Sequence, residues 1–369
     1  MTTRLEGLVA HGRREERVDE SVAPVASRAT SPWLGAVRDR VDAELASFFE
    51  TKRELTRRVG GEGTVLVDAI AELTMRGGKR LRPAVLFAAY RATHADLEDE
   101  PAALVRLGCA LELLQSYLLI HDDWMDADDE RRGGPSVHAA LRARTGNAHL
   151  GDALAILAGD LCSAYAWEQM IAAAEGLACA PALASAFVRM HQEVVLGQEL
   201  DLVATRDVSR MQKLKTGSYT IEGPLRLGAI LGGADASQLA ALEAFGAPLG
   251  EAFQVRDDLL GAFGDPQKTG KPRGNDLRAG KRTVLVLECE RASRPEERAL
   301  LSSVLGKLDA TDHEVHAVLA MFERTGVRAR AEDRLRGLLE QARVALSPAV
   351  LTSRGAEQLQ SLLVALATY

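Results

Sequence analysis

The sequence predicts an all-α protein, a single-domain antiparallel helix bundle around a central cleft. Leu, Ala, Arg and Glu, which are strong helix formers, recur along the 369 residues, and aromatic residues make up only 4%. From Trp33 onward apolar residues recur at helical spacing, and no segment shows the alternation of a half-buried strand. Glycine and proline mark the breaks between these runs, and no linker divides the chain. These observations predict one helical domain over residues 32–369.

Residues 1–31 are predicted to be a mobile extension of that domain. They mix both charges, contain few large apolar side chains and lack the apolar segment of a signal peptide. No stretch of the chain reaches the roughly 20 apolar residues that a membrane-spanning helix needs. The four cysteines are widely spaced and form no CxxC pair, which suits a reducing compartment. We therefore expect a cytoplasmic protein without stable membrane insertion.

The charge of the chain argues against nucleic acid as a partner. Its formal net charge is −7, whereas general affinity for a phosphate backbone depends on an excess of Lys and Arg. Basic residues that cluster within this acidic chain therefore indicate a specific site for a small anion.

Apolar periodicity predicts a series of helices that begins near Trp33. The further runs are 64–75, 83–93, 102–129, 149–173, 181–204, 236–263, 283–292, 313–324 and 329–345. Pro83 and Pro181 are expected at helix starts, where proline is well tolerated. The runs 102–129 and 236–263 are apolar on most sides, which indicates burial, and each becomes acidic near its end. Two buried helices that end in carboxylates indicate one shared cleft.

The first acidic end is the segment HDDWMD at 121–126. Asp122 and Asp126 are four residues apart and share a helix face, where their charges repel unless a cation lies between them. Such carboxylates suit Mg²⁺, which bridges protein oxygens and substrate phosphates. A solvated helix end is the alternative, but the motif directly follows the apolar run 118–120. The second acidic end, Asp257 and Asp258, would be unremarkable alone; the two together indicate a metal site.

Two basic segments are candidates for a diphosphate pocket. GGKRLRP at 77–83 places Lys79, Arg80 and Arg82 at a helix start, where free backbone N–H groups attract anions. Arginine suits bidentate contacts with phosphate, and Arg131 and Arg132 add two more. Taken alone, GGKRLRP would be a helix cap with exposed charge. A Gly-rich basic loop at 268–283 is either a cover for metal-bound phosphates or a flexible loop kept soluble by lysine.

The ordered series of these motifs resembles the trans-isoprenyl diphosphate synthases, also called the polyprenyl synthetase family. The matching segments are GGKRLRP (77–83), DDWMD (122–126) with RRGG (131–134), HLGDALAILAGD (149–160), GQELD (197–201), KTG (215–217), FQVRDD (253–258) and GKRT (280–283). The resemblance implies the isoprenoid synthase fold and a Mg²⁺-dependent prenyltransferase that joins isopentenyl diphosphate to allylic diphosphates. It also implies a homodimer.

The resemblance further implies a role for individual residues. Asp122, Asp126 and Asp257 would hold three Mg²⁺ ions; Lys79, Arg82, Gln115 and Arg132 would bind isopentenyl diphosphate; Arg131, Lys215, Lys271 and Lys281 would bind the allylic diphosphate; and Lys215, Thr216 and Gln254 would act at the reacting end of the allylic chain. Two positions depart from the family pattern. Gly261 stands where a third Asp is frequent, and Gln115 stands where many members carry His.

Product length is expected to be C15 to C20, with geranylgeranyl diphosphate preferred over farnesyl diphosphate. Tyr117 lies five residues before Asp122, where a bulky residue in this family resembles the floor of the elongation tunnel. Helix geometry alone favours Leu118, which lies closer to the face of Asp122. Two further alternatives are a class I terpene cyclase, which would not need a second diphosphate site, and a non-catalytic regulatory subunit.

Overall fold

The computed structural model describes residues 32–60, 64–94, 100–203, 205, 207–265, 273–346 and 350–367, and these are almost entirely helical. The prediction of an all-α fold is confirmed, with one small exception. Strands β1 (Glu130–Arg131) and β2 (Gly134–Pro135) form a short antiparallel hairpin. The predicted extension 1–31 lies outside the described residues.

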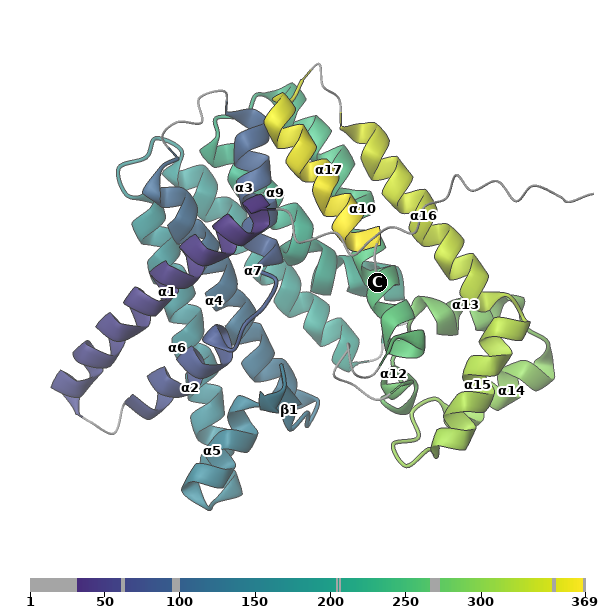
Figure 1. The fold of residues 1–369 in the computed structure, drawn as a ribbon. Coiled ribbons are helices and arrows are strands. Elements are labelled where there is room, and N and C mark those ends of the chain that lie inside the picture. Colours follow the sequence, from purple (N-terminus) through teal and green to yellow (C-terminus); the bar gives the residue numbers. More distant parts are fainter. Residues whose placement is uncertain are drawn as a thin grey trace, which may run out of the picture.

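The helices run in the following order (Figure 1). They are α1 (Pro32–Val59), α2 (Thr64–Met75), α3 (Leu81–Thr93), α4 (Ala102–Met125), α5 (Val137–Thr145), α6 (Ala148–Ala174), α7 (Ala180–Leu202), α8 (Val208–Gln212), the π-helix η2 (Lys213–Glu222), α9 (Gly223–Leu231), α10 (Ala236–Phe263), α12 (Asn275–Arg278), α13 (Val284–Ala292), α14 (Pro295–Val304), α15 (Asp312–Arg324), α16 (Val327–Ala345) and α17 (Ser353–Ala367).

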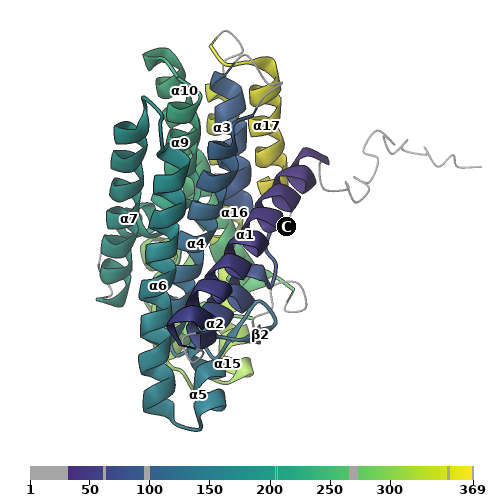
Figure 2. The same ribbon diagram turned by 90° about the vertical axis from the view of Figure 1, so that its left-hand side faces the viewer.

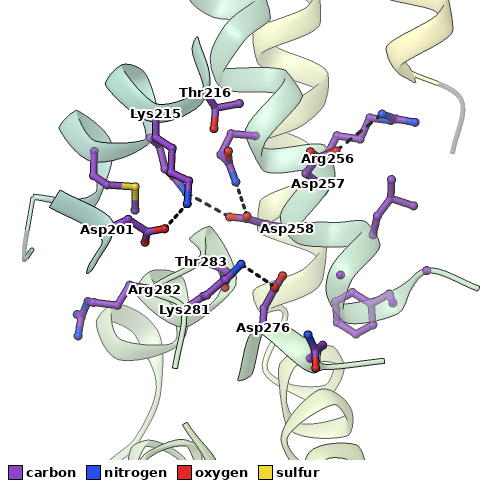
Figure 3. Close-up of a pocket in the computed structure, with 18 of the residues that line it drawn as sticks. Asp201, Lys215, Thr216, Arg256, Asp257, Asp258, Asp276, Lys281, Arg282 and Thr283 are labelled. Carbon is purple, nitrogen blue, oxygen red and sulfur yellow. Dashed lines mark hydrogen bonds and ion pairs between the residues drawn. The ribbon is translucent and has the colours of Figure 1, made fainter. Parts of the chain in front are cut away.

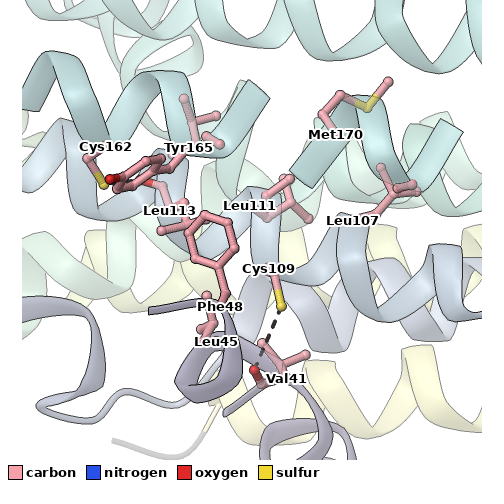
Figure 4. Packing of buried hydrophobic residues seen from close by; sticks show 14 of the residues in the cluster. Val41, Leu45, Phe48, Leu107, Cys109, Leu111, Leu113, Cys162, Tyr165 and Met170 are labelled. Carbon is pink, nitrogen blue, oxygen red and sulfur yellow. Dashed lines mark hydrogen bonds between the residues drawn. The ribbon is translucent and has the colours of Figure 1, made fainter. Parts of the chain in front are cut away.

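Helix α4 lies at the centre of the largest group of buried side chains. It packs along α6 and is crossed by α1, while α3, α6, α7, α9 and α10 stand side by side (Figure 2). Figure 4 shows Val41 and Leu45 of α1 beneath Leu107 and Leu111 of α4, all fully buried. Cys109 lies in the same group, and its thiol donates to the Val41 carbonyl. The cysteines of the described chain form no disulfide, and Cys109, Cys162 and Cys289 are buried.

Helix α4 is also the one helix of the described residues that is long and apolar enough to cross a membrane. In its most apolar window 67% of the residues are buried within the protein. That burial identifies α4 as a core helix, as the prediction of a buried helix near 102–129 required.

Side chains at the helix starts explain several boundaries. Asp235 accepts hydrogen bonds from the backbone of Ser237 and Gln238, and the Gln238 side chain accepts from Asp235, which forms a capping box at α10. Asn147 accepts from Leu150 at the start of α6. Because these caps satisfy backbone N–H groups that helix starts leave without partners, they fix where α10, which carries Asp257 and Asp258, and α6 begin.

Several predicted helix boundaries differ from the structure by one to four residues. The helix predicted over 102–129 ends at Met125, because Ala127 adopts a left-handed φ of 53° and the chain turns into the hairpin. Pro83 is the third residue of α3 rather than its first, which is tolerated because N–H groups of the first turn have no helical acceptor. Helix α7 begins at Ala180, one residue before Pro181.

Glycines in α16 and α17 give a paired test of this packing. An added Cβ at Gly355 would lie 2.2 Å from backbone atoms of Ala92 in α3, whereas at Gly337 it would meet nothing within 4 Å. We expect Gly355→Ala to lower the melting temperature because α17 must move away from α3. Gly337→Ala should raise stability by about 0.5–1 kcal/mol through helix propensity. Equal effects of the two variants in thermal unfolding would contradict the packing of α17 on α3.

Candidate active site

A cleft of about 710 Å³ opens between α10, η2 and the segment that carries α12. Asp257 and Asp258 of the second acidic motif line it, together with Lys79 and Arg131 of the basic segments. Asp122 and Asp126 of the first acidic motif are not part of the lining, but lie 3.4 and 4.0 Å from the lining residues Lys215 and Lys281. Figure 3 shows Lys215 and Asp201 on one side, Asp257 and Asp258 on another, and Asp276 and Lys281 below them. The cleft thus brings together segments that are more than 150 residues apart in the sequence, as the prediction of one shared site required.

The first acidic motif faces two lysines. Asp122 accepts a hydrogen bond of 2.7 Å from the amide of Gln198, and its carboxylate lies 3.4 Å from the ammonium of Lys215. Burial alone would raise the pKa of Asp122, but the charges of Lys215 and Lys281 hold it below its ordinary value. Asp122 is therefore ionised at neutral pH. The ammonium groups of Lys215 and Lys281 supply the positive charge that balances it.

Asp126 shares the face of Asp122 but is balanced less well. Burial and the negative charge of Asp122 raise the pKa of Asp126, and the Lys281 ammonium lies 4.0 Å away. The pair therefore shows the mutual repulsion that the sequence predicts for carboxylates spaced by four residues. A divalent cation between them would relieve it.

Arg131, predicted to bind a diphosphate, is held by the acidic residue between the two metal candidates. Its Nε donates to the buried carboxylate of Asp123 at 2.7 Å, and its guanidinium also lies 3.5 Å from Asp128. The remaining side of Arg131 lines the cleft. Asp123 therefore positions the arginine at the base of the hairpin.

The second acidic motif divides its two carboxylates between different tasks. Asp258 is buried and accepts hydrogen bonds from the Val284 backbone at 2.7 Å and from the Gln254 side chain at 2.8 Å. Asp257 faces the cleft with 48% of its side chain exposed. Burial raises the pKa of Asp258 to about 7. Asp257 is exposed only to the confined cleft, and the reduced access to water there, with the negative charge of Asp276, raises its pKa to about 6. Asp257 is thus the carboxylate available to a cation, while Asp258 joins α10 to α13.

The basic residues at the start of α3 and in the hairpin converge beside the cleft. Arg82 donates to Thr220 at 2.9 Å and lies over the ring of Tyr219, 4.2 Å from its centroid. Arg132 approaches Gly78, and burial, with the nearby charges of Arg80 and Arg82, lowers the pKa of Arg132. Several guanidinium groups that repel one another indicate a place for an anion.

Two of the predicted isopentenyl-site residues have buried polar atoms available for a ligand. The Nε of Arg82 and the Oε1 of Gln115 have no hydrogen-bond partner among the described residues. Lys79 is exposed at the rim of the same cleft. A buried polar atom without a partner is costly, so a bound ligand or water is expected there.

Arg80 has a different position from the one that its neighbours suggested. Instead of facing an anion, its guanidinium is buried and donates to Asp42, Glu112 and the carbonyl of Thr74 at 2.6–2.9 Å. The residue adopts a left-handed φ of 47°. Arg80 therefore fixes the loop from inside, with Lys79 left exposed on its outer side.

Lys215 and Thr216 lie in the π-helix η2, where the sequence had indicated a break at Gly217. The Lys215 ammonium lies 2.5 Å from Asp201 and bridges it to Asp122. Thr216 and Gln254 also line the cleft. π-Helical turns are rare in proteins overall, but many of those that occur lie at functional sites, where the extra residue per turn redirects side chains.

Not every predicted site residue is placed in the cleft by the structure. Lys271 is outside the described residues. Tyr117 and Leu118 are not part of the cleft lining; they pack partly buried on the core around α4. The Tyr117 ring meets His121 of α4 and His191 of α7 edge-on at 5.0 and 5.2 Å, so it packs between these two helices.

Sequence reasoning assigned no role to Gln198, Asp201 or Asp276, which all border the carboxylate cluster. Gln198 and Asp201 belong to the motif GQELD and are three residues apart, so they share one face of α7. That spacing could have predicted that both side chains face the same site. Asp276 has no local signal, because only the tertiary fold brings it to α10.

The donor set fits a divalent cation that is shared with a ligand. Within the described ranges no three Asp, Glu, His or Cys side chains form a closed metal cage. Two carboxylates on one helix face, with a third across the cleft, instead suit Mg²⁺, which keeps sites for water and for substrate phosphate. Lysines now placed among the carboxylates show that this space attracts positive charge.

Comparison with known proteins decides the family. A family model described as polyprenyl synthetase matches residues 64–322, which is more than half of the chain. The chain belongs to the polyprenyl synthetase family. It is therefore a prenyltransferase that makes isoprenyl diphosphates of the short-chain type, and members of this family use a divalent metal ion.

Individual polyprenyl synthetases agree in fold and differ in product. A short chain isoprenyl diphosphate synthase of Methanocaldococcus jannaschii is 32% identical over 294 residues, 78% of this chain and 82% of the relative. A geranylfarnesyl diphosphate synthase of Aeropyrum pernix is 34% identical over 81% of this chain and 92% of the relative. The solved geranylgeranyl pyrophosphate synthase of Corynebacterium glutamicum, complexed with isoprenyl diphosphate and magnesium, has a TM-score of 0.82 at 32% identity, and the match covers 91% and 98% of the two chains.

The raised pKa of Asp258 predicts how stability depends on pH. Because the pKa of about 7 in the fold exceeds the ordinary 3.8, the folded state binds this proton more tightly than the unfolded state. The resulting stabilisation is complete below pH 3.8 and is lost as the pH rises through 7. We expect the melting temperature of the metal-free protein to fall between pH 5 and pH 8 more steeply than that of Asp258→Asn. Parallel curves would contradict this account of Asp258.

Proposed function

We propose that this prenyltransferase condenses isopentenyl diphosphate with dimethylallyl, geranyl and farnesyl diphosphates and releases geranylgeranyl diphosphate. The observation that carries the proposal is that two carboxylate clusters share one cleft with lysines, beside a separate group of arginines. Two anion-binding regions in one site suit a reaction between two diphosphates. A terpene cyclase acts on one diphosphate and would not require the second region.

The carboxylates and the lysines beside them form the proposed binding region for the allylic diphosphate, which we call the allylic half of the site. Asp122, Asp126 and Asp257 hold the divalent cations, which we propose to be three Mg²⁺ ions, on the allylic diphosphate. Lys215 and Lys281 already lie at 3.4 and 4.0 Å from these carboxylates, so they are placed to contact the same diphosphate. Bound Mg²⁺ supplies electrostatic stabilisation of the leaving diphosphate. Arg131 and Lys271 complete the proposed set.

The group of arginines forms the proposed binding region for isopentenyl diphosphate, which we call the isopentenyl half of the site. Lys79, Arg82 and Arg132 provide positive charge, and the side-chain amide of Gln115 can donate its N–H groups to phosphate oxygens. The guanidinium of Arg82 is stacked on Tyr219, which restricts its orientation before any ligand binds. A diphosphate placed among these groups would relieve the repulsion between Arg82 and Arg132.

These residues explain the reaction in physical terms. Lys215, Lys281 and Arg131 would draw negative charge from the leaving diphosphate, together with the Mg²⁺ that the carboxylates would hold, so that its C–O bond can ionise. Thr216 and Gln254, which line the cleft beside Lys215, lie next to the allylic cation that results. The double bond of isopentenyl diphosphate attacks this cation from the other half of the site. The new cation then loses a proton, for which the released diphosphate is the available acceptor, and this restores a double bond. Water must be excluded at that moment, because hydrolysis competes with condensation.

A homodimer is the proposed assembly, with α6 and α7 as its interface. Both helices carry large apolar side chains that are about half exposed or more, and the two helices lie side by side on one face (Figure 2). These side chains are Leu157 and Ile171 in α6, and Leu196 and Leu202 in α7. Large exposed apolar side chains on neighbouring helices are typical of a protein–protein interface. A cytoplasmic location stays a prediction, which the burial of α4 in the core supports.

Product analysis tests the function directly. The purified protein is incubated with Mg²⁺, isopentenyl diphosphate and each of the three allylic diphosphates, and products are identified by mass spectrometry. We expect C20 as the main product, with C15 as the alternative end point. Turnover of geranyl diphosphate without isopentenyl diphosphate would instead identify a cyclase, and no turnover under any condition would support a regulatory subunit.

The metal assignment predicts the effect of two isosteric substitutions. Asp122→Asn and Asp257→Asn each remove one negative charge from the cation site and should lower kcat by about 100-fold or more. Glu323→Gln, an exposed position in α15, serves as the control. Wild-type turnover by either Asp variant, or full activity in excess chelator, would reject the assignment.

The proposed role of Tyr117 as the floor of the elongation tunnel predicts how Tyr117→Ala changes product length. If the Tyr117 side chain limits the tunnel, the shorter side chain should shift the products beyond C20 without changing the dependence on Mg²⁺. Leu118→Ala is the matched variant at the adjacent position. An unchanged product distribution from active Tyr117→Ala, together with longer products from Leu118→Ala, would assign the floor to Leu118.

A further inference from the structure

The second acidic motif lacks a carboxylate at position 261, yet a carboxylate lies there in space. Gly261 follows Asp257 by four residues, so the two positions share one face of α10. An added Cβ on Gly261 would lie 2.4 Å from Oδ2 of Asp276. The side chain of Asp276 therefore occupies the volume that a side chain at position 261 would fill.

Backbone contacts hold Asp276 in this position. The N–H of Gly274 donates to the carbonyl of Gly261 at 3.0 Å, which ties the start of α12 to the end of α10. Gly274 has a left-handed φ of 68°, which glycine adopts at little cost. The carbonyl of Asp276 accepts from the backbone of Lys281 at 2.9 Å. Asp276 is thus fixed on both sides, and the absence of a side chain at Gly261 is what leaves room for it.

The charges around Asp276 connect the two acidic motifs. The ammonium of Lys281 lies 4.0 Å from Asp276 and 4.0 Å from Asp126 of the first motif. One positive charge therefore lies between the two carboxylates, and Figure 3 shows its contact with Asp276. The charge of Asp276 also contributes to the raised pKa of Asp257. Asp276 therefore acts within the same electrostatic field as the proposed metal residues.

We propose that Asp276 supplies the third carboxylate of the second acidic motif and, with Asp257, holds the divalent cation on that side of the cleft. The inference rests on the proposed function, because it assumes that the cleft binds a metal diphosphate. It assigns a cation-holding role to a residue that lies outside both Asp-rich segments. It also explains how the chain tolerates glycine at position 261.

A purely structural role for Asp276 is the alternative. An acidic residue in the first turn of a helix is favourable by itself. However, α12 is only four residues long, and the Asp276 side chain points into the cleft, where it lines the wall opposite Lys215. Its separation from Lys281 is also long for a strong ion pair. These features favour a residue that is arranged for a cation.

Moving the carboxylate back to α10 tests the proposal. Binding of Mg²⁺ in the presence of inorganic diphosphate is measured by isothermal titration calorimetry for wild type, Asp276→Asn, Asp276→Ala and the double variant Gly261→Asp/Asp276→Ala. Asp276→Asn and Asp276→Ala should weaken Mg²⁺ binding by about 10- to 100-fold. The double variant should recover most of that loss, because alanine frees the space that the new side chain needs. Asp309→Asn, an exposed acid away from the cleft, should bind as the wild type does.

Each outcome decides between the accounts. Wild-type Mg²⁺ affinity in Asp276→Asn would overturn the inference while leaving the proposed function intact. A double variant that has the melting temperature of Asp276→Ala but no recovered affinity would also overturn it, since the carboxylate would then be needed only for local structure. If the wild type itself shows no diphosphate-dependent Mg²⁺ binding, the proposed function fails first.

Discussion

Repulsion between carboxylates at the ends of two buried helices is the constraint on which the rest of the site depends. Helices α4 and α10 bring Asp122, Asp126 and Asp257 to one cleft, and burial raises the cost of their charges. The protein balances them with ammonium groups, since Lys215 and Lys281 lie among these side chains. A site that must hold positive charge to remain stable is well prepared for metal ions and for the diphosphate they carry.

Close approaches between helices keep this arrangement rigid. An added Cβ at Gly159 would lie 2.1 Å from the His121 ring, so α6 contacts α4 directly beside the first acidic motif. An added Cβ at Gly197 would lie 2.2 Å from the backbone of Lys215, which brings α7 against the π-helix. The proposed site residues His121–Asp126 and Lys215 are therefore positioned by packed helices, which hold a geometry more accurately than loops do.

The sequence predicted the parts of this site that depend on local pattern. Helical spacing placed Asp122 and Asp126 on one face, and the apolar runs before both acidic motifs indicated a shared cleft. It did not predict features that depend on distant partners. The inward turn of Arg80 requires Asp42 and Glu112, and the position of Asp276 requires Gly261. The π-helix around Gly217 also could not be predicted, because a glycine there indicates a break when only local propensity is considered.

The central claim is that the two acidic motifs hold metal and diphosphate as one unit. A double-mutant cycle on Asp122→Asn and Asp257→Asn, read out as Mg²⁺ affinity in the presence of inorganic diphosphate, tests it most directly. The account predicts strong coupling of about 1–3 kcal/mol, so that the double variant binds scarcely more weakly than either single variant. Losses that simply add would show that the two motifs bind cations independently, and would contradict the account.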